Sequence, residues 1–166
     1  GEYPGVLRTD GSNILDEKYN EGIFVGYRWA DKEKTKPLFP FGHGLSYTTF
    51  KYGKAVADKK VMGQDEVLTV TVPVTNAGSR EGSEVVQLYI SDLKSSLSRP
   101  VKELKGFSKV RLAPGETKEV TFTIGKEALS FFDDGRHKWV AEPGKFEAIV
   151  AASAIDIKSK VLFELK

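Results

Sequence analysis

The 166-residue sequence contains no cysteine, so it offers neither a disulfide framework nor a thiolate metal site. It also lacks any apolar run of about 18 residues, the length expected of a membrane-spanning helix, and we therefore expect no membrane partner. Charge of one sign is not in excess, because 25 Lys and Arg residues stand against 23 Asp and Glu residues. A balance this close does not favour nucleic acid as a partner.

Apolar residues at helical spacing are scarce as well, and no such run is long enough to predict a helical domain. From residue 49 onward, apolar and polar residues alternate in short segments separated by Gly, Pro and Asn. The segments are 49–57, 66–76, 84–91, 102–112, 117–124, 144–152 and 160–165. The turn signal at 133–136, between 131–132 and 137–141, adds a hairpin, and 126–129 predicts one helical turn. Together they predict an all-β, antiparallel immunoglobulin-like sandwich of seven to eight strands.

Two of these segments carry more specific predictions. In 66–76 one face is apolar, and Pro73 lacks the N–H that a ladder requires, so we expect an edge strand or a bulge there. In 84–91 the residues Val86, Leu88 and Ile90 lie on one face, and Val85, Gln87 and Tyr89 lie on the other.

Residues 36–50 do not follow this pattern. Two prolines, two glycines and five large apolar side chains (Leu38, Phe39, Phe41, Leu45 and Tyr47) lie within 37–47. Pro37 and Pro40 favour extended neighbours, and Gly42 and Gly44 permit unusual backbone angles. The stretch predicts a rigid connector whose aromatic side chains must be buried against something. Before it, residues 1–36 are turn-rich and aperiodic, with a possible short strand at 23–25 and a charged, solvated loop at 31–36.

The connector has the sequence Pro37-Leu38-Phe39-Pro40-Phe41-Gly42-His43-Gly44-Leu45-Ser46-Tyr47-Thr48. This segment resembles the one that precedes the C-terminal domain in glycoside hydrolase family 3. Residues 19–28 resemble that family's segment just upstream. Residues 74–78, 82–89, 99–107 and 112–117 resemble its fibronectin type III-like domain. The resemblance covers nearly the whole chain in order.

The resemblance implies a C-terminal part of a β-glucosidase, with 1–47 as connector and remnant of an α/β domain and 48–166 as the fibronectin type III-like sandwich. Its partners would be the catalytic barrel and the α/β domain of the same parent chain. In that family the carboxylate nucleophile and the acid/base of retaining hydrolysis lie upstream, so no catalytic residue is carried over, and no cofactor or metal is expected. Because the chain begins with Gly1, we expect a processed or excised piece; its compartment stays open, with a periplasmic or secreted parent preferred.

The resemblance directs attention to residues that could dock on the missing domains, where buried aromatics would contribute about 1.5–3 kcal/mol each. The predicted docking residues are Tyr27, Arg28, Phe39, Phe41, His43, Leu45 and Tyr47. Without the partner, these groups should be exposed, disordered or buried in a self-contact.

Other side chains have a plainer interpretation beside each functional one. Glu21 suggests an acid but can cap a turn or pair with Arg28, and His43 between two glycines can simply fix the connector. The pair Asp133-Asp134 suggests a cation site but suits a hairpin turn better. Trp29 and Trp139 could stack on sugars, but contact with the missing domain is the preferred explanation for Trp29, and core or inter-sheet packing is preferred for Trp139.

Three functions follow from these patterns. The first is an accessory domain of a family 3 β-glucosidase. The second is an independent carbohydrate-binding or adhesion-type module. The third keeps the accessory role but makes the parent a β-xylosidase or another exo-glycosidase.

Overall fold

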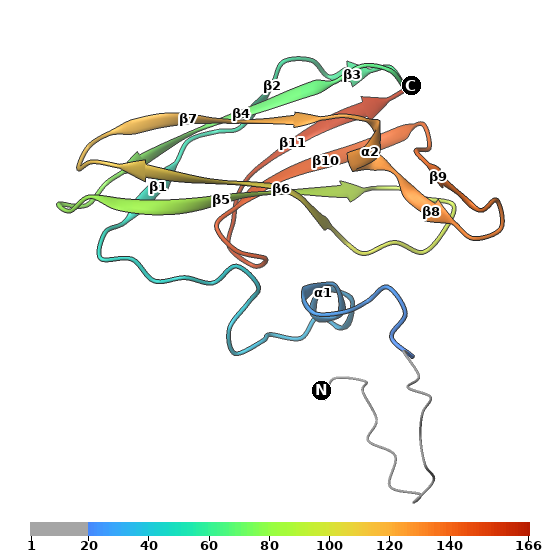
Figure 1. The fold of residues 1–166 in the computed structure, drawn as a ribbon, viewed down its shortest axis with the longest axis horizontal. Coiled ribbons are helices and arrows are strands. Elements are labelled where there is room, and N and C mark those ends of the chain that lie inside the picture. Colours follow the sequence, from blue (N-terminus) through green and yellow to red (C-terminus); the bar gives the residue numbers. More distant parts are fainter. Residues whose placement is uncertain (1–19) are drawn as a thin grey trace, which may run out of the picture.

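The computed structural model describes residues 20–166, and the turn-rich character predicted for residues 1–19 lies outside that range. The described chain forms two packed sheets with a short helix beneath them (Figure 1). The helices are α1 (Tyr27–Glu33) and α2 (Lys126–Leu129). The strands are β1 (Phe50–Tyr52), β2 (Val56–Ala57), β3 (Val61–Met62), β4 (Leu68–Asn76), β5 (Gly82–Asp92), β6 (Glu103–Leu112), β7 (Thr117–Ile124), β8 (Phe131–Asp133), β9 (Lys138–Val140), β10 (Gly144–Ala151) and β11 (Ile157–Leu165).

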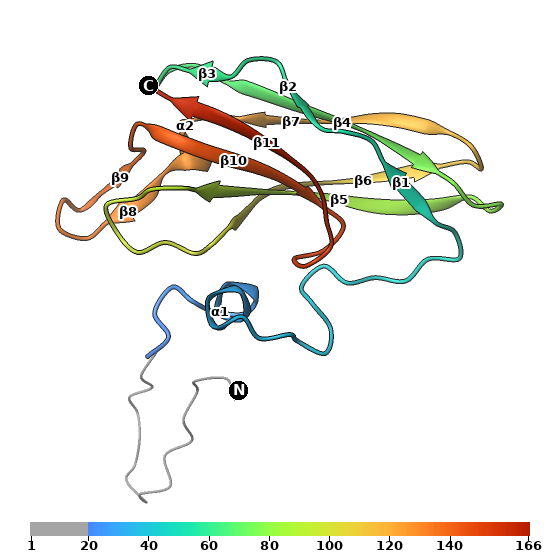
Figure 2. The same cartoon turned by 180° about the vertical axis from the view of Figure 1, so that it is seen from behind.

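The first sheet is built around β4, which pairs with β7 on one side and with β1 and β2 on the other. The second sheet has the order β3-β11-β10-β5-β6. The strand pairs are antiparallel except the short β3–β11 contact. Strands β8 and β9 form a separate two-stranded hairpin that projects at one end, as both faces of the molecule show (Figures 1 and 2). The all-β sandwich predicted from alternation is therefore confirmed.

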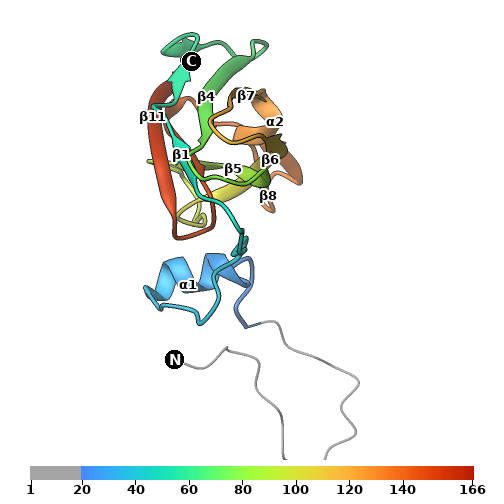
Figure 3. The same cartoon turned by 90° about the vertical axis from the view of Figure 1, so that its left-hand side faces the viewer.

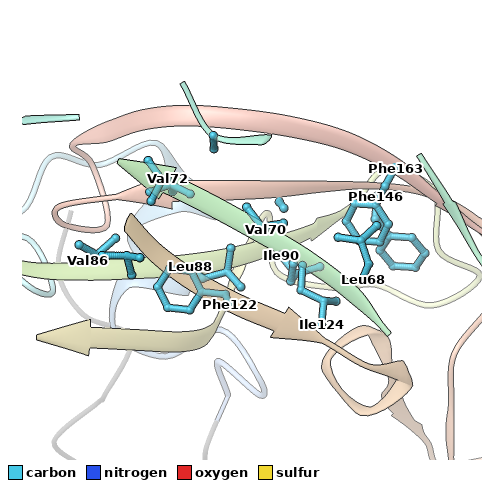
Figure 4. Close-up of a cluster of buried hydrophobic side chains, with 14 of the residues drawn as sticks. Leu68, Val70, Val72, Val86, Leu88, Ile90, Phe122, Ile124, Phe146 and Phe163 are labelled. Atoms are coloured by element: carbon cyan, nitrogen blue, oxygen red, sulfur yellow. The ribbon is translucent and has the colours of Figure 1, made fainter. Parts of the chain in front are cut away.

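The core lies between the sheets and is made by the alternating apolar faces (Figure 4). Every second residue of β4 from Leu68 to Asn76 is buried, while the intervening residues are only half-buried. These side chains face Val86, Leu88 and Ile90 of β5, together with aromatic rings from β7, β10 and β11. Alternation with period two is thus sufficient to place the buried face of these strands.

Pro73 does not mark a sheet edge, contrary to the prediction, because β4 has neighbours on both sides. The Gly53 N–H donates to the Pro73 carbonyl at 2.8 Å, so the side of Pro73 that lacks a donor faces the gap between β1 and β2. A Cβ at Gly53 would collide with the Pro73 ring, which explains the glycine. The segment 49–57, predicted as one strand, is split at this gap into β1 and β2.

The region before the connector also departs from prediction. Residues 23–25 form a turn and coil rather than a strand, and the following Tyr27–Glu33 forms α1. Gly26 (φ 59°) precedes this helix and Lys34 (φ 53°) ends it in the left-handed region. Seven residues are too few to establish a 3.6-residue period, so the sequence gives little warning of this helix. Within residues 20–166, no helix combines the length and apolarity needed to cross a membrane.

Candidate docking surface

Helix α1 is held against the second sheet by three contacts to Lys102, just before β6, and to Glu103 and Leu104, its first two residues. The Leu104 N–H donates to the Tyr27 hydroxyl oxygen at 2.8 Å. The Arg28 guanidinium lies 3.3 Å from the Glu103 carboxylate. The Lys102 ammonium donates to the Asp31 carboxylate, and both side chains are largely buried. Figure 3 shows α1 lying directly beneath the sandwich as a third layer.

Glu103 takes part in several ion pairs where α1 contacts the second sheet. Besides Arg28, its carboxylate accepts a hydrogen bond from Arg99 at 2.7 Å and lies 3.8 Å from Lys105. Burial lowers the pKa of Lys105, while the neighbouring Glu103 partly opposes that shift by favouring the charged ammonium. Three cations converging on one largely buried carboxylate stabilise the strand that contacts α1.

A small apolar cluster fills the space between α1 and the sheet. Tyr89, Ile149, Ala151 and Ala154 are buried there, with Tyr27 and Leu104 packed against them. The rings of Tyr27 and Tyr89 meet edge to face, with centroids 5.6 Å apart. Strand β5 is consequently buried on both faces from Val86 to Ile90, which is typical of a strand covered on two sides.

The connector is attached to the same face at a second point, around Gln87. The Tyr89 hydroxyl donates to the Gln87 side-chain oxygen at 2.6 Å, and the Gln87 amide donates to the Ala152 carbonyl at 3.0 Å. Gly42 lies so close to Gln87 that any Cβ would collide with the side-chain amide. Gly42 also has a φ of 79°, which side chains disfavour. The Ala154 N–H completes the attachment by donating to the Phe41 carbonyl at 2.9 Å.

Between and beyond these attachments, the large apolar side chains of the connector point into solvent. Leu45 and Tyr47 are each 94% exposed, and Leu38, Phe39 and Phe41 are also exposed. We call these five residues the connector patch. Several large apolar side chains gathered on one exposed segment are typical of interaction sites.

A groove of about 770 Å³ runs beside the connector patch. The connector residues 40–52 form one wall, and the loop between β10 and β11 forms the other. Across its floor the Tyr52 hydroxyl donates to the Glu84 carboxylate at 2.9 Å. Burial raises the pKa of Glu84, against the opposing effect of that hydrogen bond, and burial together with Glu84 raises the pKa of Tyr52.

The structure separates the predicted docking residues into two groups. Tyr27 and Arg28 contact the sandwich itself. Phe39, Phe41, Leu45 and Tyr47 are exposed, and His43 is exposed beside the Phe39 ring at a centroid distance of 5.6 Å. Docking of this second group on another domain stays a prediction.

Three residues important for the seam were missed in the sequence: Asp31, Lys102 and Gln87. The prediction of a solvated loop from residue 31 is wrong for Asp31, because it lies within α1 and pairs with Lys102. One available signal was the apolar character of both faces of 84–91, since a strand with two apolar faces needs a second covering layer.

Of the remaining candidates, Glu21 and Asp133 each take part in a turn. Arg28 pairs with Glu103 rather than Glu21, whose carbonyl accepts from the Phe24 N–H in a turn. No group of three His, Asp or Glu side chains in this range could hold a metal ion. Asp133 stabilises the predicted hairpin turn, since its carboxylate and carbonyl both accept from the Arg136 N–H.

Trp29 and Trp139 differ in their exposure to solvent. The Trp29 ring is half-buried, with the Lys32 ammonium 5.4 Å from its centroid. Trp139 is 69% exposed on β9, which contradicts the core-packing alternative for this residue.

Comparison with known proteins agrees with this geometry. Residues 84–154 match the fibronectin type III-like domain. Over this range the sandwich resembles a fibronectin type III-like domain. The chain is 54% identical to the β-glucosidase BoGH3A of Bacteroides ovatus over 160 residues, which is 96% of this chain and 21% of that protein. It is 49% identical to thermostable β-glucosidase B of Acetivibrio thermocellus, covering 95% and 21% of the two.

A solved structure gives the same result in three dimensions. The family 3 β-glucosidase of Bifidobacterium adolescentis superposes with a TM-score of 0.88 at 34% identity, covering 98% of this chain and 23% of that one. The chain therefore corresponds to the C-terminal, fibronectin type III-like region of family 3 β-glucosidases, and it spans only about a fifth of their length. The resemblance to glycoside hydrolase family 3, which rested on the connector and on short segments of the strands, is confirmed.

Proposed function

We propose that this fibronectin type III-like domain is the accessory domain of a family 3 β-glucosidase, called the parent below. In the parent, the connector patch would dock on the catalytic domains that precede it. The parent would hydrolyse terminal β-D-glucosyl residues with retention, using two carboxyl groups that lie outside this chain. The relatives that support this proposal are themselves named β-glucosidases.

The observation that carries the proposal is the state of the connector. It is attached to the sandwich through α1 and through Gly42, yet five large apolar side chains beside these attachments face solvent. A flexible linker does not require its apolar side chains to be held in fixed positions. A docking surface requires that arrangement, because side chains ordered before contact lose less entropy on binding.

The partner is best sought within the same chain. The patch lies on the segment through which the chain enters the sandwich, so a preceding domain is held near it at high effective concentration. Even a modest apolar contact is then sufficient to orient the two domains. The accessory domain would brace the catalytic body rather than perform chemistry.

The first test is enzymatic. The purified 166-residue chain should release no measurable product from an aryl β-glucoside, whereas the parent should. Turnover by the chain alone would contradict the proposal, because the proposal places both catalytic carboxyl groups outside this chain.

The second test addresses the docking patch. In the parent, Leu45→Asp combined with Tyr47→Ser should lower the thermal midpoint, because a charge and a hydroxyl would replace buried apolar groups. In the isolated chain, the same double variant should leave the midpoint within about 1 °C, since surface changes of this kind cost about 0.5 kcal/mol or less. Equal effects in both contexts would show that the patch has no partner.

A further inference from the structure

The β8–β9 hairpin carries two aromatic side chains on the face that turns away from the core. Phe132 and Trp139 are directly opposite each other in the antiparallel register. Their rings meet edge to face with centroids 5.8 Å apart, and they are 45% and 69% exposed. The adjacent Phe131, on the opposite face of the hairpin, is buried. The hairpin therefore presents one indole and one phenyl ring to solvent.

This aromatic pair is separate from the connector patch. The hairpin projects from one end of the sandwich, whereas the connector enters β1 at the other end, and both views agree on this separation (Figures 1 and 2). Docking of the connector patch on a preceding domain therefore does not by itself account for Trp139.

The hairpin is also held in a defined shape. Three residue pairs align β8 with β9. In the turn, the Arg136 N–H donates to the Asp133 carboxylate at 3.1 Å, and the Arg136 side chain lies 3.3 Å from the same carboxylate. Asp134 and His137 are exposed in this turn, two positions from Phe132 and Trp139 respectively. The aromatic pair is thus a fixed surface with polar groups beside it.

We propose that Phe132 and Trp139 form a binding surface for a β-linked gluco-oligosaccharide, with Asp134 and His137 as hydrogen-bonding partners for its hydroxyls. A glucopyranose ring with equatorial substituents has two faces lined by C–H groups, and these faces pack on an indole while the hydroxyls remain at the edges. An exposed indole with a few polar neighbours has the matching distribution of apolar and hydrogen-bonding groups. The choice of glucose as the sugar rests on the proposed function.

Two other occupants fit less well. A stable contact with a second copy buries roughly 800 Å² on each partner, which one ring pair cannot supply. The neighbours Asp134, Arg136 and Lys138 are exposed and charged, so the apolar area does not extend beyond the two rings. A small ligand that needs one aromatic face agrees better with these limits.

The chain offers a matched control, since it has only two tryptophans. The Trp29 ring already has the Lys32 ammonium near one face and is half-buried. Trp29→Phe therefore leaves Trp139 as the single fluorescent reporter without touching the proposed surface. Trp139→Ala removes the surface itself, and because this side chain is exposed the variant should keep its thermal midpoint.

The experiment is a titration of the Trp29→Phe chain with cellopentaose, followed by tryptophan emission. We expect a saturable shift with a dissociation constant in the millimolar range, and no shift with maltopentaose, whose α-linkages curve the chain away from a flat surface. Calorimetry on the Trp139→Ala chain should show binding weakened at least tenfold, and Phe132→Ala should weaken it less. An absent shift, or equal binding by the Trp139→Ala chain, would overturn the proposal.

This result is distinguishable from a failure of the proposed function. The titration uses the 166-residue chain alone and does not depend on any preceding domain. Cellopentaose could bind at Trp139 while the connector patch shows no partner in the parent. That result would support the sugar-binding surface and contradict the proposed structural role in the parent. The reverse outcome leaves the bracing role and removes the sugar surface.

Discussion

Lys102 and Asp31 form an ion pair between the start of β6 and helix α1, with side chains only 5% and 16% exposed. The Lys102 ammonium also lies 5.7 Å from the centroid of the Tyr89 ring. The pair joins residues 71 positions apart, and it fixes the segment before the connector to the sandwich. The connector patch is therefore presented by a fixed third layer.

Removing one partner of this pair should release α1. In Lys102→Met, the carboxylate of Asp31 loses its counterion in a buried setting, which costs about 3 kcal/mol. We expect amide exchange in residues 27–34 to rise roughly 100-fold, a factor that corresponds to this energy at about 1.4 kcal/mol per tenfold. Amides of β4 should be unchanged.

The exposed pair Lys59–Glu66 provides the control for that experiment. Lys59→Met removes a cation from a solvent-exposed pair, and such surface pairs contribute little to stability. Equal exchange in α1 for Lys102→Met and the unaltered chain would show that the buried pair does not hold the helix.

Gly42 and Gly44 test the second attachment point. Gly42→Ala places a methyl group against Gln87 and forces a side chain into the left-handed region, so we expect a loss of about 2 kcal/mol or more in the free energy of unfolding. Gly44→Ala meets no atom within 4 Å and should change it by less than about 0.5 kcal/mol. Urea denaturation of the two variants measures the difference, and similar stabilities would contradict the close approach to Gln87.

Asn76 joins the end of the connector to both sheets. Its fully buried amide accepts from the Thr48 hydroxyl at 2.6 Å and donates to the carbonyls of Arg80 and Leu112. Asn76→Ala would leave these groups unpaired, and we expect a loss of about 3 kcal/mol in unfolding free energy. Thr75→Ala, one residue away on the exposed face, should cost about 0.5 kcal/mol. Comparable losses in the two variants would argue against the buried network.

Glu84 in the groove predicts a dependence of stability on pH. Its folded pKa is raised above the ordinary value of 4.5, chiefly by burial, so the folded state holds this proton more tightly than the unfolded state. The resulting stabilisation is present in full below pH 4.5 and is lost as the pH rises through the folded pKa. The stability difference between the unaltered chain and Glu84→Gln should therefore shift in favour of Glu84→Gln between pH 4 and pH 7. A difference that is constant with pH would show that Glu84 is not perturbed.

The sequence was sufficient for the sandwich because strands such as β4 and β7 bury one face each. The alternation from Leu68 to Val74 and from Val120 to Ile124 identifies that face directly. The sequence was insufficient for α1, whose seven residues are held by long-range contacts rather than by their own periodicity. Contacts such as Lys102–Asp31 join residues that are far apart in the chain. No local sequence pattern predicts which distant charged residues form such a pair. The prediction of an edge strand at Pro73 was wrong for a related reason. The two short strands β1 and β2 leave a gap beside Pro73, so no strand there needs the N–H that proline lacks.

The exposed residues of the connector were predictable as a group, because five large apolar side chains between prolines and glycines cannot all enter a sheet. Which of the predicted residues would be exposed was not predictable. Tyr27 accepts a hydrogen bond from β6, whereas Leu45 and Tyr47 lie beyond the second attachment and are almost fully exposed.

The docking of the connector patch is tested most directly by the chemical accessibility of Leu45. The chain has no cysteine, so Leu45→Cys introduces a single thiol in it, and Glu119→Cys on β7 of the other sheet gives an exposed control position. The rate of reaction with a thiol reagent should be similar for both variants in the 166-residue chain. In the parent, we expect the Leu45→Cys thiol to react at least tenfold more slowly, with Glu119→Cys unchanged. Equal rates for Leu45→Cys in the parent and in the chain alone would contradict docking.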